Sequence, residues 1–248
     1  MLNFATPHSS WRELLVSPAR PAHIVQLYDR DEFLAAGVAF FAAEGLRRGE
    51  AVLLTGTQAH LRGIQRALAA LDVDPDAVMR DGRLRISDVH QAVAGDALES
   101  ARGDGRFTGV RWWGEMSNVL QQQGKRRAAM AAEGLGDAAA KKYGIALFCS
   151  FLCDKFDPRG YDGILRDVCG AHSHVIPAED YVRHRLAVNR AIAEVVGDLK
   201  GSLLQSLRSW NGFACDMPSS QAMLFWVRDA MPEHFDAVLS RTKAYEAR

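Results

Sequence analysis

The stretch "HIVQLYDRDEFLAAGVAFFAAEGLRRGEAVLLTG" (residues 23–56) decides the fold, because it places one amphipathic run between two short apolar runs. Its two ends, residues 23–29 and 50–56, have the length and apolar content of buried strands. Its middle, residues 30–49, carries apolar side chains near helical spacing and ends in "RRG", a cationic last turn followed by a C-cap glycine. A strand, a helix and a strand in this order predict a parallel βαβ unit.

The same alternation continues toward the C-terminus. The further elements that we expect are a helix at 57–71, a turn at 72–82, a strand at 83–88, a helix at 90–100, a strand at 110–116, a helix at 117–144 and a strand at 145–152. The predicted fold is therefore α/β, with a mainly parallel sheet flanked by helices.

The character of the chain changes after Pro177. Residues 180–210 have the three- and four-residue apolar spacing of a long amphipathic helix, and two further helices follow, the first opening at Pro218 and the second at Pro232. The apolar positions of the long helix are Leu186, Ile192, Val196, Leu199, Leu203, Leu207 and Trp210. We divide the chain into an N-terminal arm (1–22), an α/β domain (23–180) and a helical tail (181–248). The tail has more apolar surface than it can bury alone, which favours a homodimer, with an intramolecular helical cap as the alternative.

The composition excludes several classes of protein. Lys and Arg number 30 and so do Asp and Glu, which gives no reason to expect a nucleic-acid partner. The longest apolar run, "IALFCSFLC", is shorter than the ~18–20 residues that span a bilayer, and no signal peptide is recognisable, so we expect a cytoplasmic protein without a membrane partner. Four cysteines in a chain of 248 residues predict reduced thiols and no disulfide.

Residues 23–88, together with "VRWWGEM" (110–116), "LFCSF" (147–151) and "CGAHSHVIPAEDY" (169–181), resemble the MEDS family, the sensory domain named from methanogens, methylotrophs and the regulator DcmR. The resemblance covers roughly residues 20–181. It implies a bacterial sensory or signal-transduction regulator whose α/β domain is related to the KaiC and RecA nucleoside triphosphatases. In that relationship the second strand opens with Gly-Glu, as "GEAVLL" does here.

The loop after the first strand does not have the chemistry of a phosphate loop. A working loop reads G-x-x-x-x-G-K-[ST], in which backbone N–H groups and the lysine hold the phosphates. This chain has "YDRDEFL" at that place, with Asp29, Asp31 and Glu32 at the start of a helix. Carboxylates there suit the helix dipole but repel a triphosphate. We therefore expect a non-catalytic protein without a cofactor, and a residual nucleotide- or metal-dependent hydrolase is the alternative.

A ligand site in an open parallel sheet is expected beyond the carboxyl ends of the strands. The aromatic, acidic and hydroxyl residues at these ends suit a small neutral or cationic ligand better than a phosphate. The candidates are Tyr28, Asp29, Asp31, Thr55, Thr57, Trp112, Trp113 and Glu115. For the two tryptophans the alternative is a structural role, with one in the core and the other under a helix.

The segment "CGAHSHVIPAEDY" permits three interpretations. A zinc site would combine ligands from Cys149, Cys153, Cys169, His172 and His174, although their spacing matches no recognised set. A cysteine–histidine dyad is the second interpretation. The third is a junction in which "HSHV" closes the sensory domain and "PAEDY" starts the long helix. We prefer the junction and keep His172 and His174 as ligand-binding or coupling candidates. The partners expected are a small-molecule ligand, a signalling protein, or both.

Overall fold

The structure, a computed structural model, describes residues 10–90, 99–100, 105–197 and 215–247. The chain forms two compact units, which are described one at a time. The larger comprises residues 12–152, and the smaller comprises residues 153–248 with the first eleven residues. Among the described residues, no helix is both long enough and apolar enough to cross a membrane.

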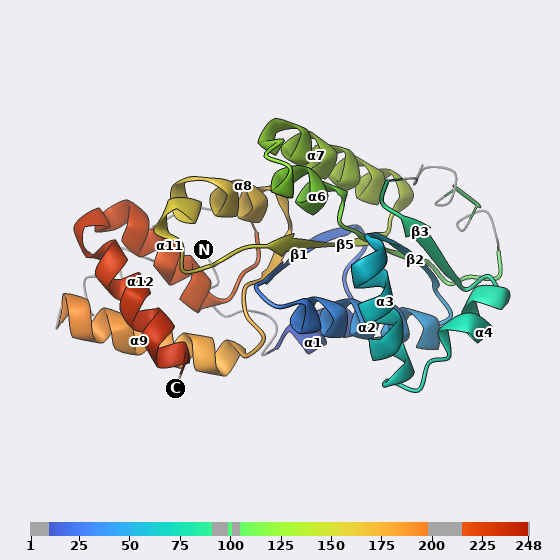
Figure 1. The fold of residues 1–248 in the computed structure, drawn as a ribbon, viewed down its shortest axis with the longest axis horizontal. Coiled ribbons are helices and arrows are strands. Elements are labelled where there is room, and N and C mark those ends of the chain that lie inside the picture. The colour runs from blue at the N-terminus through green and yellow to red at the C-terminus, as the bar shows by residue number, and fades with distance from the viewer. Residues whose placement is uncertain (1–9, 91–98, 101–104, 198–214, 248) are drawn as a thin grey trace. The chain divides into compact units, whose positions relative to one another are not determined.

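The larger unit alternates strands and helices, as the sequence predicts (Figure 1). Its elements are α1 (Trp11–Val16), β1 (Ala22–Tyr28), α2 (Asp31–Arg47), β2 (Ala51–Gly56), α3 (Gln58–Ala69), α4 (Pro75–Arg80), β3 (Leu84–Asp88), β4 (Val110–Gly114), α6 (Met116–Gln122), α7 (Arg126–Tyr143) and β5 (Ala146–Leu152). The five strands lie in the order β3-β2-β4-β5-β1, and all neighbouring pairs are parallel. The predicted α/β class and parallel sheet are confirmed.

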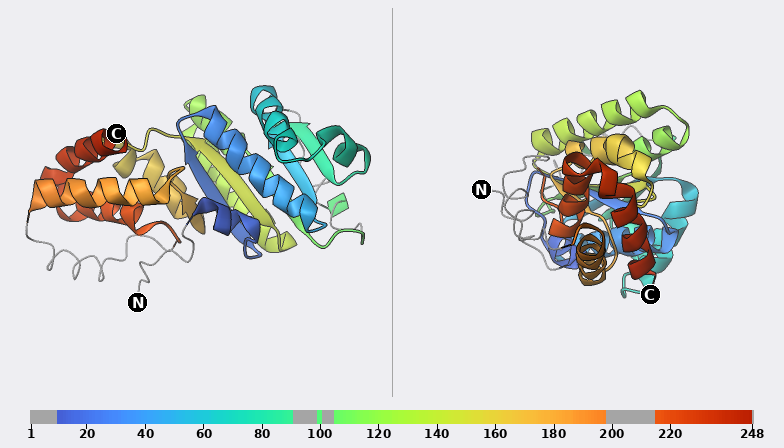
Figure 2. Two further views of the ribbon diagram at one scale, coloured as in Figure 1. Left: turned by 90° about the horizontal axis from the view of Figure 1, so that it is seen from below. Right: turned by 90° about the vertical axis from the view of Figure 1, so that its left-hand side faces the viewer.

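Helices cover both faces of this sheet. Figure 1 shows α6 and α7 on one face and α1, α2 and α3 on the other, and the left panel of Figure 2 shows α2 lying along the strands. Every residue of β1 and of β2 is buried. Parallel strands that are covered on both faces are expected to be apolar runs without alternation, which is how "HIVQLY" and "AVLL" appear in the sequence.

Two expected elements of this unit differ in detail from the structure. The single helix expected at 117–144 is two helices, α6 and α7, because Gly124 adopts a left-handed conformation between them (φ 74°). Residues 75–80, expected in a turn, form the short helix α4, with Pro75 in its first turn and the Asp74 side chain capping its N-terminus. The helix expected at 90–100 falls mostly outside the described residues.

A buried arginine joins three elements of this unit. Arg111 on β4 pairs with Glu50 and donates hydrogen bonds to the carbonyl oxygens of Leu15 (2.7 Å) and Phe41 (2.9 Å), on α1 and α2. Burial lowers the pKa of Arg111 to about 10, and the side chain is 1% exposed. The carboxylate and carbonyl partners satisfy a charge that would otherwise be costly to bury.

The smaller unit is mainly helical. Its elements are η1 (Pro158–Asp162), α8 (Ile164–Ala171), β6 (His174–Ile176), α9 (Tyr181–Val196), α11 (Ser219–Ala230) and α12 (Pro232–Glu246). The ring of Tyr161 is fully buried, with ring centroids 4.9 Å from Phe225 and 4.8 Å from Phe235. Because η1 packs on α11 and α12 in this way, the division between the units falls after residue 152, and not near residue 180 as expected.

The first helix of the expected tail begins where the sequence predicts. Asp180 caps α9 by accepting a hydrogen bond from the backbone N–H of Arg183 (2.9 Å). The described part of this helix ends at Val196, and Gly197 follows with φ 72°. The expected continuation through Leu199, Leu203, Leu207 and Trp210 lies outside the described residues. The two later helices, α11 and α12, begin at the predicted prolines or next to them.

Candidate functional site

Three segments of the site lie at the carboxyl ends of the strands in the larger unit. Tyr28 is the last residue of β1, Thr57 follows β2, and Glu115 follows β4. Strands β2 and β4 are adjacent and in register up to Thr55 and Gly114. The residues that follow β2 and β4 are therefore brought side by side at one edge of the sheet.

Glu115 is the centre of this site. Its side chain is fully buried, one carboxylate oxygen accepts a hydrogen bond from the backbone N–H of Thr57, and the other lies 2.6 Å from Nδ1 of His60. Thr57 is the N-cap of α3, so the carboxylate lies at the positive end of that helix. A buried carboxylate is costly unless it is paired, and here the helix start and the imidazole both pair with it.

His60 connects Glu115 to an exposed acid. Its second ring nitrogen, Nε2, lies 3.5 Å from a carboxylate oxygen of Asp31, the first residue of α2. The hydrogen bond to Glu115 is the main cause that raises the pKa of His60 above its ordinary value, and burial opposes it. Because both ring nitrogens face carboxylates, His60 is favoured as an imidazolium that donates to both.

Tyr28 and Asn118 complete the wall of the site. The ring of Tyr28 meets that of His60 edge-on, with centroids 6.0 Å apart. The Tyr28 hydroxyl accepts a hydrogen bond from the Asn118 amide (3.1 Å), whose oxygen accepts from the backbone N–H of Leu152 (3.0 Å). Burial is the largest cause of a strongly raised pKa of Tyr28, so its phenol stays neutral and keeps a proton to donate.

Gly56 allows the close packing around Glu115. A Cβ at this position would lie 2.5 Å from the ring of Trp113 and 2.9 Å from the Glu115 carboxylate. Both distances are shorter than real Cβ contacts, so any side chain here would displace Glu115 or Trp113. The glycine at the end of β2 is thus a requirement of the site.

The structure brings four of the predicted site residues together around His60. These four are Tyr28, Asp31, Thr57 and Glu115. Asp29 is exposed beside them, 3.9 Å from the Arg30 side chain.

The other three candidates on this sheet have structural partners. Trp112 donates to the Thr55 hydroxyl (3.2 Å), and Trp113 is fully buried and donates to the Ser150 hydroxyl (3.0 Å). The alternation of the two tryptophans along β4 places one of them in the core, as the structural alternative proposes.

The two predicted histidines of the "HSHV" segment lie in the smaller unit. His172 is buried, with Nδ1 2.7 Å from the carbonyl oxygen of Val168 one helical turn earlier. His174 begins β6 and lies 3.5 Å from the Asp216 carboxylate. Backbone hydrogen bonds from Val175 to Asp216 (2.9 Å) and from Asp216 to Ser173 (2.8 Å) fix this segment beside the start of the last helical pair.

The predicted zinc ligands do not form one set. Cys149 belongs to β5 in the larger unit, whereas Cys153 and Cys169 belong to the smaller unit. Within the residues that the structure describes, Cys153, Cys169 and His174 are not part of any group of three or more potential metal ligands. Burial raises the pKa of Cys153 to about 12 and that of Cys169 well above its ordinary value, which gives neither thiol the character of a nucleophile.

Sequence reasoning missed two residues of the site, His60 and Asn118. Both lie in the first turn of a helix that starts at the carboxyl edge of the sheet. A usable signal is present for His60, because it follows the capping residue Thr57 by three positions and so points back toward the start of its helix.

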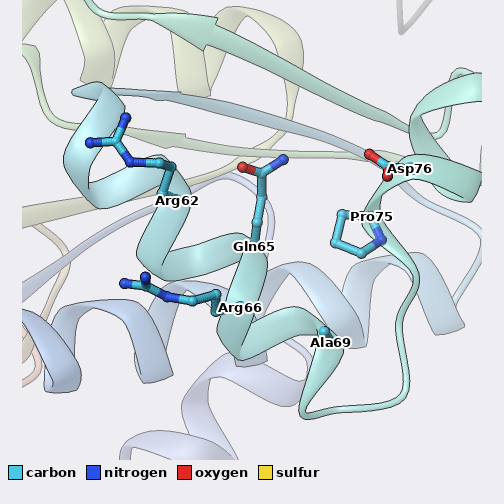
Figure 3. A pocket seen from close by; sticks show the side chains of 6 residues that line it. All are labelled: Arg62, Gln65, Arg66, Ala69, Pro75 and Asp76. Atoms are coloured by element: carbon cyan, nitrogen blue, oxygen red, sulfur yellow. The ribbon is translucent and has the colours of Figure 1, made fainter.

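A separate groove lies between α3 and α4, with a volume of about 400 Å³. It is lined by Arg62, Gln65, Arg66, Ala69, Pro75 and Asp76. In Figure 3 the guanidinium groups of Arg62 and Arg66 extend away from Pro75 and Asp76. None of the residues around Glu115 lines this groove, so it is distinct from the site at the strand ends.

The chain matches a family of known proteins. The family model described as "MEthanogen/methylotroph, DcmR Sensory domain" (MEDS) matches residues 22–173. No curated protein matches the chain. The matched residues include all five strands of the larger unit and the site around Glu115.

Proposed function

The chain belongs to the MEDS family of sensory domains, and on this premise we propose that it is a non-catalytic, cytoplasmic regulator whose larger unit binds a small neutral or cationic molecule at the carboxyl ends of β1, β2 and β4. One observation carries the proposal. A fully buried carboxylate, Glu115, is held between the start of α3 and an imidazolium at the edge where open parallel sheets bind ligands.

The charges at this edge define the class of ligand. Asp29 and Asp31 are exposed there, with side chains 68% and 74% accessible, whereas Tyr28 is buried. An organic cation or a neutral hydrogen-bond donor is attracted to the exposed carboxylates, whereas a polyphosphate is repelled. The relationship to RecA-like nucleotide-binding domains is part of this proposal, with the phosphate loop replaced by Asp29, Arg30 and Asp31.

Signalling follows from the position of His60. A ligand that contacts Asp31 or His60 competes with the contacts that hold α2 and α3 against Glu115. Ligand binding then favours one arrangement of the starts of α2 and α3 over another. A sensor of this kind responds to its ligand by such a shift between two arrangements. Output by contact with a signalling protein or a second copy of the chain completes the proposal.

The test uses the full chain and three sets of small probes. Native mass spectrometry of the protein as isolated shows any retained ligand, and thermal unfolding is then followed with small organic ammonium ions, their neutral isosteres, and Mg-ATP. We expect stabilisation by ammonium ions or neutral compounds and none by Mg-ATP. Asp31→Asn should weaken an ammonium ligand by up to about five-fold, the range of an exposed charge pair.

Glu32→Gln is the matched control, because it removes the same charge from the same exposed turn of α2. Equal weakening by Asp31→Asn and Glu32→Gln would show a diffuse charge effect and contradict the proposed site. Stoichiometric nucleotide binding with hydrolysis would replace the sensor with the alternative, a residual hydrolase.

A further inference from the structure

A second cluster of chemically active side chains lies inside the larger unit. It consists of His23 on β1, Cys149 on β5 and Glu133 on α7. All three are buried, with 2%, 7% and 2% of their surfaces exposed. Strands β1 and β5 are neighbours, with Val25 opposite Cys149, so His23 and Cys149 point to the same face of the sheet. Helix α7 packs on both strands.

A glycine allows α7 to come close to this face. A Cβ at Gly136 would lie 2.9 Å from the Leu147 side chain and 3.9 Å from Nε2 of His23. Leu147 is opposite His23 in the register of β1 and β5. The absence of a side chain at Gly136 therefore lets the helix place Glu133 directly over the two strands.

The three donor atoms have the separations of ligands around one metal ion. The imidazole Nε2 of His23 lies 3.1 Å from a Glu133 oxygen and 3.4 Å from the Cys149 sulfur, and the sulfur lies 3.7 Å from the same oxygen. Zinc–ligand bonds of about 2.0–2.3 Å at tetrahedral angles put neighbouring donors roughly 3.3–3.6 Å apart. The cluster thus has the dimensions of one face of a zinc tetrahedron.

We propose that His23, Glu133 and Cys149 bind a single Zn²⁺ ion within the α/β unit, and that this ion belongs to the folded sensory domain. The donor set selects the metal. Thiolate is unsuited to Mg²⁺ or Ca²⁺, and carboxylate is unsuited to Cu⁺, whereas an imidazole, a carboxylate and a thiolate together suit Zn²⁺.

The surroundings also fit a bound cation. The Glu133 carboxylate and a Cys149 thiolate would place two negative charges in this buried cluster, and these need a positive charge beside them. A coordinated metal ion supplies that charge and deprotonates the thiol. The second ring nitrogen of His23 lies 3.9 Å from an Asp137 carboxylate oxygen, which is longer than a hydrogen bond but adds a negative charge near the cluster.

The competing explanation needs no metal. A protonated His23 would neutralise Glu133, and the Cys149 thiol would donate a hydrogen bond to the same carboxylate. Both explanations fit the same three distances. They differ in whether Cys149 is a thiolate bonded to a metal, which can be observed directly.

The experiment replaces zinc with a coloured probe. Full-length protein is treated with a chelator and titrated with Co²⁺, whose bond to a thiolate gives an intense charge-transfer absorption. We expect one Co²⁺ per chain, displaced by one Zn²⁺, with this absorption. Cys149→Ser should abolish the absorption, and His23→Gln should weaken Zn²⁺ binding by more than the ~10–100-fold that loss of an outer-shell partner costs.

Cys169→Ser is the matched control, since Cys169 is also buried but lies in the smaller unit. The absorption should survive this change. Absence of the absorption in the wild-type protein, or its persistence in Cys149→Ser, would overturn the proposal. Should Cys149→Ser fail to fold, X-ray absorption of the zinc-loaded wild-type protein decides the matter: one sulfur ligand supports the site, and none refutes it.

Discussion

His60 is the side chain through which pH should act on the larger unit. Its pKa is raised in the folded chain, first by the hydrogen bond to Glu115 and then by the charges of Glu115 and Asp31. Tyr28, the third group facing it, stays neutral because burial raises its pKa. A pKa above the unfolded value of about 6.5 means that the folded state binds the proton more tightly. The stabilisation by His60 is therefore complete below that value and is lost as the pH rises through the folded pKa.

The raised pKa of His60 predicts a pH-dependent difference in stability between the wild-type protein and a His60 variant. We expect the free energy of unfolding of the wild-type protein to exceed that of His60→Gln most clearly at pH 5.5–6, by about 1–2 kcal/mol, and the gap to shrink as the pH rises. Urea unfolding across this range measures it. His234→Gln, an exposed histidine on α12, serves as the control and should show no such trend. A gap that widens with increasing pH would contradict the imidazolium assignment.

Gly56 offers a test of the close packing at Glu115. Gly56→Ala places a methyl group against Trp113 and the Glu115 carboxylate and should destabilise the protein by about 1–3 kcal/mol, the usual cost of overpacking. Gly63→Ala, in the middle of α3, is the matched substitution, because its methyl group would meet only Ala35 at 3.7 Å. That change should stabilise by roughly 0.5–1 kcal/mol through helix propensity. Thermal unfolding measures the change in stability of both variants. Equal changes would show that Gly56 is not packed tightly against Trp113 and Glu115.

The strands and helices show how much of the fold can be predicted from sequence patterns. All five strands of the larger unit begin and end within two residues of their predicted bounds, because buried parallel strands are short apolar runs between turn residues. The same pattern places Tyr28, Asp31, Thr57 and Glu115 at the carboxyl ends of the strands, since each follows or ends a strand. That these residues bind a ligand stays a prediction. Periodicity did not reveal the break at Gly124, where a single left-handed residue divides one helical run.

Contacts across long stretches of sequence could not be predicted in the same way. His60 meets Glu115 across 55 residues, and His23 meets Cys149 across 126. These pairings depend on the order of the strands and on which helix covers which face, and neither is fixed by local periodicity. The proposed zinc ligands therefore emerged only from the packed structure.

A substitution at Arg111 tests how much the contacts between α1, α2 and β4 contribute to stability. Arg111→Lys keeps a positive charge but loses the planar group that reaches Glu50 and the carbonyl oxygens of Leu15 and Phe41. We expect a loss of about 1–3 kcal/mol, the cost of leaving buried carbonyl oxygens without their donors. Arg62→Lys, on the exposed side of α3, should change stability by less than about 0.5 kcal/mol. Urea unfolding compares the two, and similar midpoints would show that the Arg111 contacts contribute little.

The division of the chain after residue 152 changes where an output surface is sought. Residues 153–171, which the sequence assigns to the α/β domain, fold with α11 and α12 around Tyr161. The family match ends at residue 173 and so includes part of the smaller unit. The smaller unit is thus not a separate appendage that begins at the long helix. In the proposed regulator, its outer surface is the place where a partner would bind.

Among the described residues of the smaller unit, those on the exposed side of α9 are the ones that we propose to contact a second copy of the chain. Val182 and Leu186, four residues apart on one face of the helix, are 52% and 61% exposed, whereas Ala187, Val188, Ala191 and Ile192 face inward. We expect light scattering after size exclusion to give twice the chain mass of 27.3 kDa. Leu186→Glu should weaken this dimer by at least about 30-fold, because it puts a charge into an apolar contact at a cost of ~2 kcal/mol or more.

The control for this substitution is Leu135→Glu, which changes an even more exposed leucine (74%) on α7 of the larger unit. It should leave the dimer intact. A wild-type monomer, or a dimer that Leu135→Glu disrupts and Leu186→Glu does not, would move the contact away from α9. Helix α9 packs on α12, and the His184–Glu246 pair joins the two helices. A dimer through α9 would therefore also link α11 and α12, the last two helices of the described chain, to the partner copy.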